Sequence, residues 1–283
     1  MTDVQSILLV VLEVAFGFAV GSFLCVIIER MPVILEESDR FGDMYGMRPW
    51  KEVIGGSSRC STCGEPIRAR DKIPLVSWLV LRGQCRGCGD RIPAFHPVVE
   101  LAVPAVGAAV VISMGWGWQV IPVLWLVPVG IAVSAIDFRT YMVPTRLVWP
   151  AFFVSLALSV VSALVAHEPR WLLGGVVGLL AVAGPLFVIW FILPRGMGFG
   201  DVRLATLLGW TVGFGSIDGS WVTAFFIGVL TLAGAAVVGI VLSIVGLTAR
   251  GRHAKVPFAP SLVIASLVCA CFAGYILNGF GIN

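Results

Sequence analysis

Charged side chains are scarce in this sequence. Only 12% of its 283 residues are Asp, Glu, Lys or Arg, whereas a soluble globular domain averages roughly 25%. Hydrophobic residues make up 58% of the chain, and the mean hydropathy is +0.98. Runs of nearly uncharged residues long enough to cross a bilayer recur along the chain. They disfavour one unusually apolar soluble core and indicate a polytopic membrane protein.

The apolar runs predict an all-α membrane protein with about eight transmembrane helices. The sixth run is short and contains Thr206, Gly209 and Thr211, which fits a half-embedded or tilted helix. The first run has neither a basic leading segment nor a small-residue cleavage site, so a cleavable signal peptide is not predicted. The eight runs lie near 5–28, 97–114, 118–136, 147–166, 171–193, 202–215, 220–247 and 260–278.

Basic residues are unevenly distributed between the loops. Eleven of the 19 Lys and Arg residues lie in the segment 30–96. If the chain crosses the membrane eight times, seven of the remaining eight basic residues fall on the same side as this segment. Only Arg170 falls on the opposite side. Because basic loops stay in the cytoplasm, both termini are expected outside and residues 30–96 inside.

The net charge of +3 is explained by this topology and by anionic lipid headgroups. No nucleic-acid-binding motif is present, so the bilayer is an expected partner and nucleic acid is not. Nor does any internal repeat favour the two inverted halves of a transporter.

The sequence divides into three blocks. Residues 1–29 are expected to form the first transmembrane helix, with Arg30 and Pro32 marking its exit into water. Residues 30–96 are polar and contain paired cysteines, as a small inserted cytoplasmic domain would. Residues 97–283 contain the other seven spans, joined by short loops.

Four of the seven cysteines are arranged as two C-x-x-C pairs, "CSTC" and "CRGC". Two such pairs about twenty residues apart suit a tetrahedral zinc site in a zinc-ribbon-like insert. A glycine follows each pair and frees the backbone to turn its amides toward the thiolates. Disulfides are the alternative, but the expected cytoplasmic location disfavours them. A closed site of this kind is structural, because it leaves no open ligand position. The four ligands are Cys60, Cys63, Cys85 and Cys88.

Acidic residues are rare after residue 100, where only four occur. The topology places Glu168 and Asp218 in outside loops, where solvated charge explains them. It leaves Asp137 and Asp201 at the cytoplasmic ends of two spans, at nearly the same depth. Acids in such positions are usually functional. The alternative is that each pairs with a nearby arginine as a membrane-edge anchor; the candidates are Arg139, Arg146, Arg195 and Arg203.

Two carboxyl groups within hydrogen-bond reach share a proton, because like charges about 3 Å apart cannot both ionise. One then deprotonates a water molecule while the other protonates a scissile carbonyl, which is the chemistry of an aspartic protease. The titration belongs to the pair, so neither residue is assigned as the acid. Gly198 and Gly200 precede Asp201 and would let a substrate backbone approach.

Five ordered motifs resemble the type IV prepilin leader peptidases, which are intramembrane aspartic proteases of the G-x-G-D class. They are "GSFLCVIIERMP", the cysteine-bearing insert, "DFRTYMVPTRLVWP", "GMGFGDVRL" and "VPFAPSLV", and the resemblance extends over nearly the whole chain. The sequence departs from the family where Cys25 replaces a usual Asn, Glu29 a Tyr, Thr145 an Asp and Arg203 a Lys.

The resemblance implies an enzyme of the bacterial inner membrane that removes the short basic leader from prepilins or pseudopilins at the cytoplasmic face. Asp137 and Asp201 match the two aspartate motifs of the family. Many members with the cysteine-bearing insert also methylate the new N-terminus with S-adenosylmethionine. No glycine-rich nucleotide fingerprint locates a methyl-donor site in this sequence.

Glu13, Glu29, Glu100 and His96 have no assigned role. Glu13 lies in mid-span and is expected to be protonated or paired. Glu29 and Glu100 flank the insert, where they would either fix it by hydrogen bonding or contact a leader or methyl donor. His96 is expected to be a hydrogen-bonded interface residue.

Two non-protease functions compete with the peptidase. One is a scaffold that docks partners through a zinc ribbon. The other is a transporter with an acidic proton relay.

Overall fold

The computed structural model describes residues 3–40, 53–194, 197–216, 220–250 and 257–279, and these form helices and short loops. The chain divides into two compact units, Met1–Ala108 and Ala109–Asn283. The helix α4, Phe95–Met114, contains the boundary between them. Each unit is described by itself below.

The first unit contains the long helix α1, Asp3–Arg40, and the first turns of α4. A Cβ on Gly17 would lie 2.8 Å from Pro104 Cα, and one on Gly21 would lie 3.0 Å from Glu100 Cα. Glycine therefore lets α1 approach the backbone of α4. The candidate membrane span in α1 is Ile7–Met31, but the helix continues nine residues past this span before its described part ends.

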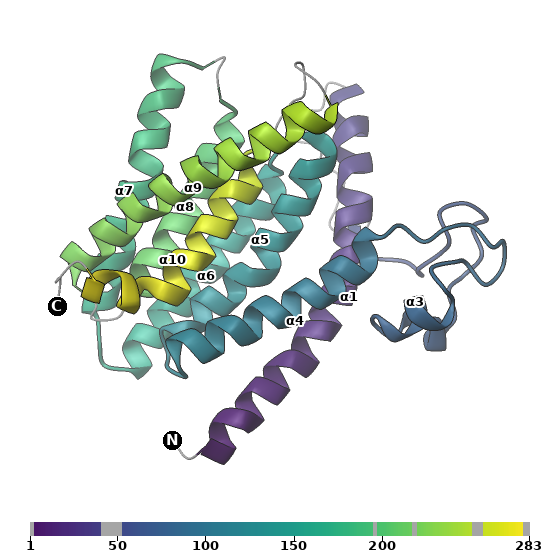
Figure 1. Ribbon diagram of the computed structural model, residues 1–283, viewed down its shortest axis with the longest axis horizontal. Helices are drawn as coiled ribbons and strands as arrows, with labels where there is room; N and C mark the ends of the chain where they lie inside the picture. Colours follow the sequence, from purple (N-terminus) through teal and green to yellow (C-terminus); the bar gives the residue numbers. More distant parts are fainter. Residues whose placement is uncertain (1–2, 41–52, 195–196, 217–219, 251–256, 280–283) are drawn as a thin grey trace. The chain divides into compact units, whose positions relative to one another are not determined.

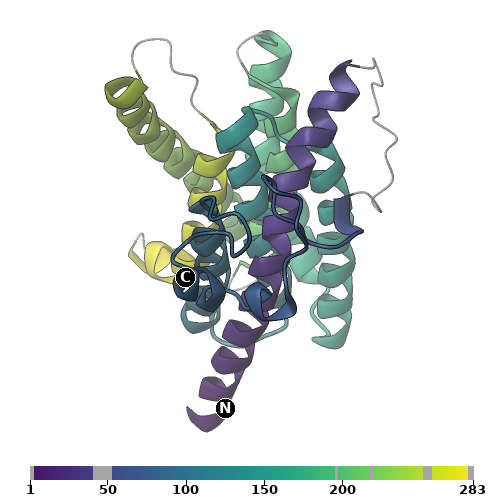
Figure 2. The ribbon, with the colours of Figure 1, turned by 90° about the vertical axis from the view of Figure 1, so that its right-hand side faces the viewer.

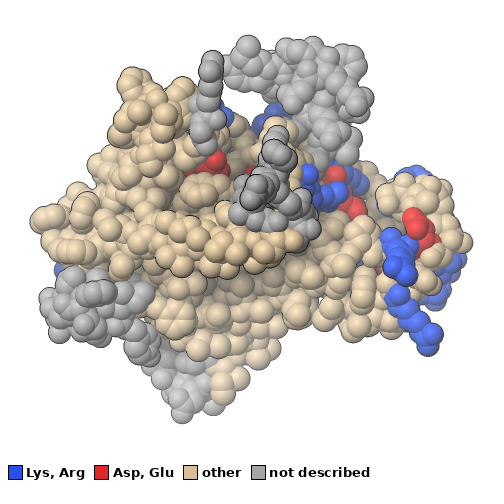
Figure 3. Space-filling model, turned by 45° about the horizontal axis from the view of Figure 1, so that its top comes forward, with Lys and Arg blue, Asp and Glu red and all other residues tan. Residues whose placement is uncertain are grey.

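The part of the insert described after residue 52 has little regular structure. It contains the 3-10 helix η1, Ala69–Lys72, and the short helix α3, Val76–Val80. Two isolated antiparallel bridges, Arg59 with Pro66 and Gln84 with Arg91, each enclose one C-x-x-C pair. On the face that Figure 3 shows, blue Lys and Arg side chains are prominent on the insert, while most of the helical surface is uncharged.

Six further helices follow in the second unit (Figures 1 and 2). Neighbouring helices pack along their length, and α9 lies against both α7 and α10. The six are α5 Val120–Thr140, α6 Thr145–Val165, α7 Arg170–Ile192, α8 Phe199–Phe214, α9 Trp221–Arg250 and α10 Ala259–Gly279.

Helix α8 is the centre of the second unit, since it contacts every other helix there, α5 to α10. From Leu207 to Phe214 each of its residues is buried. Trp210 Nε1 donates to Ser159 Oγ at 3.0 Å, and the Thr211 and Ser155 hydroxyls lie 3.1 Å apart, so polar contacts join α8 to α6. Protein surrounds this helix, which explains why its sequence contains Thr and Gly.

The closest pair is α7 with α8. A Cβ on Gly174 would lie 2.7 Å from Gly213 O, and one on Gly178 would lie 2.7 Å from Gly213 Cα. Small residues at such an interface bring two helix backbones into van der Waals contact, which is the main attraction between helices in lipid.

Six helices of the described residues are long and apolar enough to cross a membrane, in agreement with the prediction of an all-α membrane protein. They are Ile7–Met31, Phe95–Met114, Val120–Thr140, Thr145–Val165, Arg170–Ile192 and Trp221–Gly246. The other two predicted spans are also helical: α8 has 16 residues, and α10 has 21, of which Ala259–Phe272 form a shorter apolar helix. The four-cysteine cluster lies between the first and second of the six.

Candidate functional site

The two C-x-x-C pairs form matching turns. In each, the first cysteine's amide donates to a carbonyl five residues on: Cys60 N to Glu65 O at 3.0 Å, and Cys85 N to Asp90 O at 2.7 Å. The glycine after each pair has a positive φ, 71° at Gly64. At 74°, Gly89 matches it. The predicted glycine turns are present in both copies.

The four sulfur atoms lie within 4.8 Å of one another, and Cys60 Sγ is 3.8 Å from Cys88 Sγ. A tetrahedral metal with metal–sulfur bonds of about 2.3 Å places its sulfurs about 3.8 Å apart. All four thiols are free. The amides of Cys63 and Thr62 donate to Cys60 Sγ and lower the pKa of that thiol to about 7. The residues present therefore fit a four-thiolate metal ion.

Asp137 lies in the last turn of α5 and is 4% exposed. Its Oδ2 accepts a hydrogen bond of 3.0 Å from the backbone amide of Ala259, at the start of α10. Tyr141 ends α5 in the left-handed conformation and donates its own amide to Asp137 O. The carboxyl group is thus held by a residue 122 positions away.

Asp201 lies in the first turn of α8, where its amide donates to Gly198 O at 3.1 Å. A helix N-terminus favours negative charge. Asp137 and Asp201 lie on helices that contact each other, α5 and α8, and the start of α8 packs against Val143 in the loop that follows α5. Among the described residues, no hydrogen bond joins the two carboxyl groups.

The two glycines before Asp201 differ in their surroundings. A Cβ on Gly200 would lie 2.9 Å from Val143 Cβ, so glycine is needed there for the helix to pack on the α5–α6 loop. A Cβ on Gly198 would meet Asp201 Oδ2 at 3.6 Å, which is ordinary contact. Their role in substrate access stays a prediction.

Arginine anchoring finds no support among the described residues, where neither Asp137 nor Asp201 forms an ion pair. Arg203 instead donates to Thr145 Oγ1 and lies over the Phe199 ring, 4.6 Å from its centroid. Two of the residues considered above, Arg195 and Asp218, lie outside the described residues.

In the first unit, Glu29 Oε1 is 3.0 Å from His96 Nε2, and Glu100 Oε2 accepts from the Leu75 amide at 2.7 Å. Glu100 thus ties the insert to α4, one of the two roles considered for it. Glu13 Oε2 is buried without a hydrogen-bond partner in the described part of the chain.

Sequence reasoning assigned no role to Ala259. Its contribution is a backbone amide, which no side-chain pattern identifies. The sequence "PFAP" could have indicated that a helix begins near Ala259, because proline is common at the first position of a helix.

Comparison with known proteins gives two family matches that together cover most of the chain. The bacterial peptidase A24 N-terminal domain matches residues 15–114. The type IV leader peptidase family matches residues 124–277, more than half of the chain. No solved structure matches.

Curated relatives match over nearly their full length, and those cited here are named prepilin leader peptidase/N-methyltransferase. The one from Stutzerimonas stutzeri is 31% identical over 282 residues, covering 96% of this chain and 93% of the relative. The one from Aeromonas hydrophila is 30% identical over 279 residues, covering 95% and 92%. The one from Neisseria gonorrhoeae is 30% identical over 276 residues, covering 91% and 88%.

Proposed function

The chain belongs to the type IV leader peptidase family, and we propose that Asp137 and Asp201 are its catalytic pair. It is a multi-pass membrane enzyme with the function of a prepilin leader peptidase/N-methyltransferase. The observation that carries the proposal is that Asp137 ends α5 and Asp201 begins α8, two helices in contact, and that the Asp137 carboxyl accepts a hydrogen bond from the Ala259 amide.

The pair performs general acid–base catalysis. One carboxylate takes a proton from water, and the water oxygen attacks the scissile carbonyl carbon. The other carboxyl donates its proton to the carbonyl oxygen. Collapse of the tetrahedral intermediate breaks the carbon–nitrogen bond, and the new amino terminus takes up a proton as it leaves. Because the two carboxyl groups share one proton, neither residue is assigned as the acid or as the base.

The substrates are prepilins or pseudopilins, cut at the cytoplasmic face of the bacterial inner membrane. The distribution of Lys and Arg supports this orientation, with residues 30–96 inside and both termini outside. This orientation requires eight crossings, and two of them, α8 and α10, are additional to the six long apolar helices. The division into residues 1–29, 30–96 and 97–283 belongs to the same proposal.

The four-cysteine cluster holds structural zinc. Its ligands are Cys60, Cys63, Cys85 and Cys88, whose sulfur spacing suits a tetrahedral ion. Between residues 55 and 94 the insert has little regular structure, so metal binding stabilises its fold. Replacing Cys60 and Cys85 by Ser is expected to remove the zinc measured in the purified protein.

The methyl donor for N-methylation is S-adenosylmethionine. When bound, it supplies the methyl group that the new amino terminus of the substrate accepts.

The decisive experiment measures prepilin cleavage by Asp137→Asn and Asp201→Asn variants in purified membranes. Each change keeps the size of the side chain and removes the acid, so cleavage should fall by at least about a hundredfold, with unchanged amounts of protein in the membrane. Glu168→Gln changes a half-buried acid of the same unit that pairs with Arg170, so it is the matched control and should cleave normally. Cleavage by the double aspartate variant would disprove the mechanism.

A further inference from the structure

The outer side of the short helix α3 in the insert is apolar. Residues three or four positions apart share one face of a helix, and three apolar residues of α3 follow this spacing, with a fourth just before the helix. These four residues are 50–71% exposed, and we call them the α3 face. A contiguous exposed apolar patch usually marks an interface. The four are Ile73, Val76, Leu79 and Val80.

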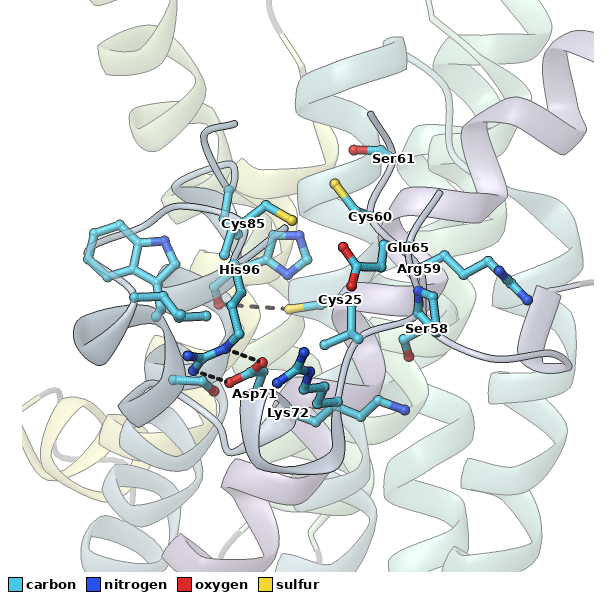
Figure 4. A pocket seen from close by; sticks show the side chains of 18 of the residues that line it. Cys25, Ser58, Arg59, Cys60, Ser61, Glu65, Asp71, Lys72, Cys85 and His96 are labelled. Carbon is cyan, nitrogen blue, oxygen red and sulfur yellow. Dashed lines mark hydrogen bonds and ion pairs between the residues drawn. The ribbon is translucent and has the colours of Figure 1, made fainter. Parts of the chain in front are cut away.

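The opposite side of α3 faces inward. Trp78 and Leu81 line a cavity of about 420 Å³ in the first unit, together with Asp71 and Lys72 near η1 (Figure 4). The Trp78 ring packs closely on Gly83, where a Cβ would lie 3.0 Å from the ring. Trp78 therefore holds the inner side of the helix against the insert, and the α3 face is the side that the insert presents to its surroundings.

The backbone on both sides of α3 adopts an uncommon conformation. Leu75 and Arg82 have positive φ angles of 59° and 53°, which residues other than glycine rarely adopt. The Leu75 amide donates to Glu100 Oε2 at 2.7 Å, so this strained residue is tied to α4. Backbone strain persists only where the surrounding contacts fix it. The outward presentation of the α3 face is therefore built into the insert.

The same hydrogen bond sets α3 at the level of a membrane surface. Glu100 lies in the second turn of the candidate span Phe95–Met114, about 7.5 Å along the helix from its first residue. The headgroup region on each side of a bilayer is about 5–8 Å thick. The α3 face thus lies at the depth where apolar side chains of surface-bound helices meet headgroups and the ends of acyl chains.

Basic residues accompany the α3 face. Between residues 68 and 82 the sequence contains four basic residues and one acid, and that acid, Asp71, is paired with Arg86. The 3-10 helix η1, which contains Arg70 and Lys72, packs on α3. Long basic side chains beside an apolar patch match an anionic lipid surface. The four basic residues are all exposed: Arg68, Arg70, Lys72 and Arg82.

We propose that the α3 face docks the insert on the anionic surface of the membrane that the protein spans. The apolar side chains enter the boundary between headgroups and acyl chains, and the basic side chains contact lipid phosphates. A second copy of the chain is a poorer match, because two such faces would bring like charges together. The proposal goes beyond peptide cleavage and methyl transfer, since it gives the insert a lipid-binding surface.

The test places the photo-crosslinking amino acid p-benzoylphenylalanine at Leu79 of the full-length protein. The protein is reconstituted in nanodiscs of phosphatidylcholine, with or without phosphatidylglycerol, and mass spectrometry identifies what the probe attaches to after illumination. Ser61, exposed in the first cysteine turn, carries the probe in the control. Leu79 should give several times more lipid adduct than Ser61, and phosphatidylglycerol should raise the yield at Leu79.

The charge arm of the test combines Arg70→Gln with Lys72→Gln in the Leu79 probe protein. This variant should lose most of the increase caused by phosphatidylglycerol, because fewer charges contact the lipid phosphates. Zinc content reports whether the insert of each variant is folded. If the Leu79 probe protein loses zinc, Val80, the most exposed residue of the α3 face, carries the probe instead.

The same illumination in cytoplasmic-membrane vesicles offers the face its other occupants. Attachment to a second copy of the chain or to another protein in place of lipid would overturn the proposal. Equal lipid yields at Leu79 and Ser61 would also overturn it, as would a yield that phosphatidylglycerol does not change. None of these measurements depends on peptide cleavage, so they stand apart from the test of the catalytic pair.

Discussion

Gly198 and Gly200 look equivalent in the sequence but have different surroundings. Sequence reasoning interpreted both as openings for substrate, because glycine has no Cβ. The contact with Val143 could not be predicted, since it depends on how the α5–α6 loop meets the start of α8. Charge scarcity, topology and motif order predict the two aspartates as the catalytic pair, and this stays a prediction. The contact with the Ala259 amide could not be predicted, because any residue has a backbone amide.

Gly200→Ala should destabilise the protein and Gly198→Ala should not. A Cβ at 200 would lie 2.9 Å from Val143 Cβ, whereas a Cβ at 198 meets only ordinary contacts. Overpacking of this kind costs about 1–3 kcal/mol, to be measured as a lower thermal midpoint in detergent. Comparing kcat/KM for the two variants then tests substrate access. A stable Gly198→Ala protein with full activity would remove that role from Gly198.

At the scale of elements, the apolar runs predicted the helices well because lipid requires long uncharged segments. They did not predict where α1 ends. A helix needs no apolar residues once it has left the membrane, so the polar residues up to Arg40 continue it. The cysteine turns were predictable, because a C-x-x-C pair followed by glycine is compatible with few backbone conformations.

The cysteine turns allow a prediction for metal-free protein. After removal of metal by a chelator, Cys60 should be the thiol that iodoacetamide modifies at the lowest pH, with a midpoint near its pKa of about 7. Cys88 should react only under more alkaline conditions, because its pKa is raised to about 12. Peptide mass spectrometry across a pH series measures both. With metal bound, all four thiols should be protected. Equal midpoints for Cys60 and Cys88 would contradict the prediction.

The close packing of α7 on α8 can be tested with two matched glycine-to-alanine substitutions on α7. Gly178→Ala would place a Cβ 2.7 Å from Gly213 Cα, whereas Gly184→Ala on α7 meets nothing within 4 Å. The first should separate the two helices and lower thermal stability. The second should be neutral or slightly stabilising, since alanine is the better helix former. Similar thermal midpoints for the two variants would show that the close approach does not hold α8 in place.

For the whole molecule, the distribution of basic residues predicts which side each loop occupies. An alkaline phosphatase domain fused after Asn283 should be active, because that enzyme requires the oxidising side of the membrane, and one fused within residues 41–52 should be inactive. Enzyme activity in intact cells, normalised to fusion protein abundance, is the measurement. An inactive C-terminal fusion would mean that α8 or α10 does not cross.

The short length of α8 affects how water, the second reactant of hydrolysis, reaches Asp201. Sixteen helical residues extend about 24 Å, less than the roughly 30 Å of hydrocarbon in a bilayer. Because the other helices of the second unit surround α8, protein and not lipid borders the missing length. Water inside the protein can then reach the end of α8 that bears Asp201, so a hydrolytic enzyme gains hydration of its acids from a helix that is shorter than the hydrocarbon layer.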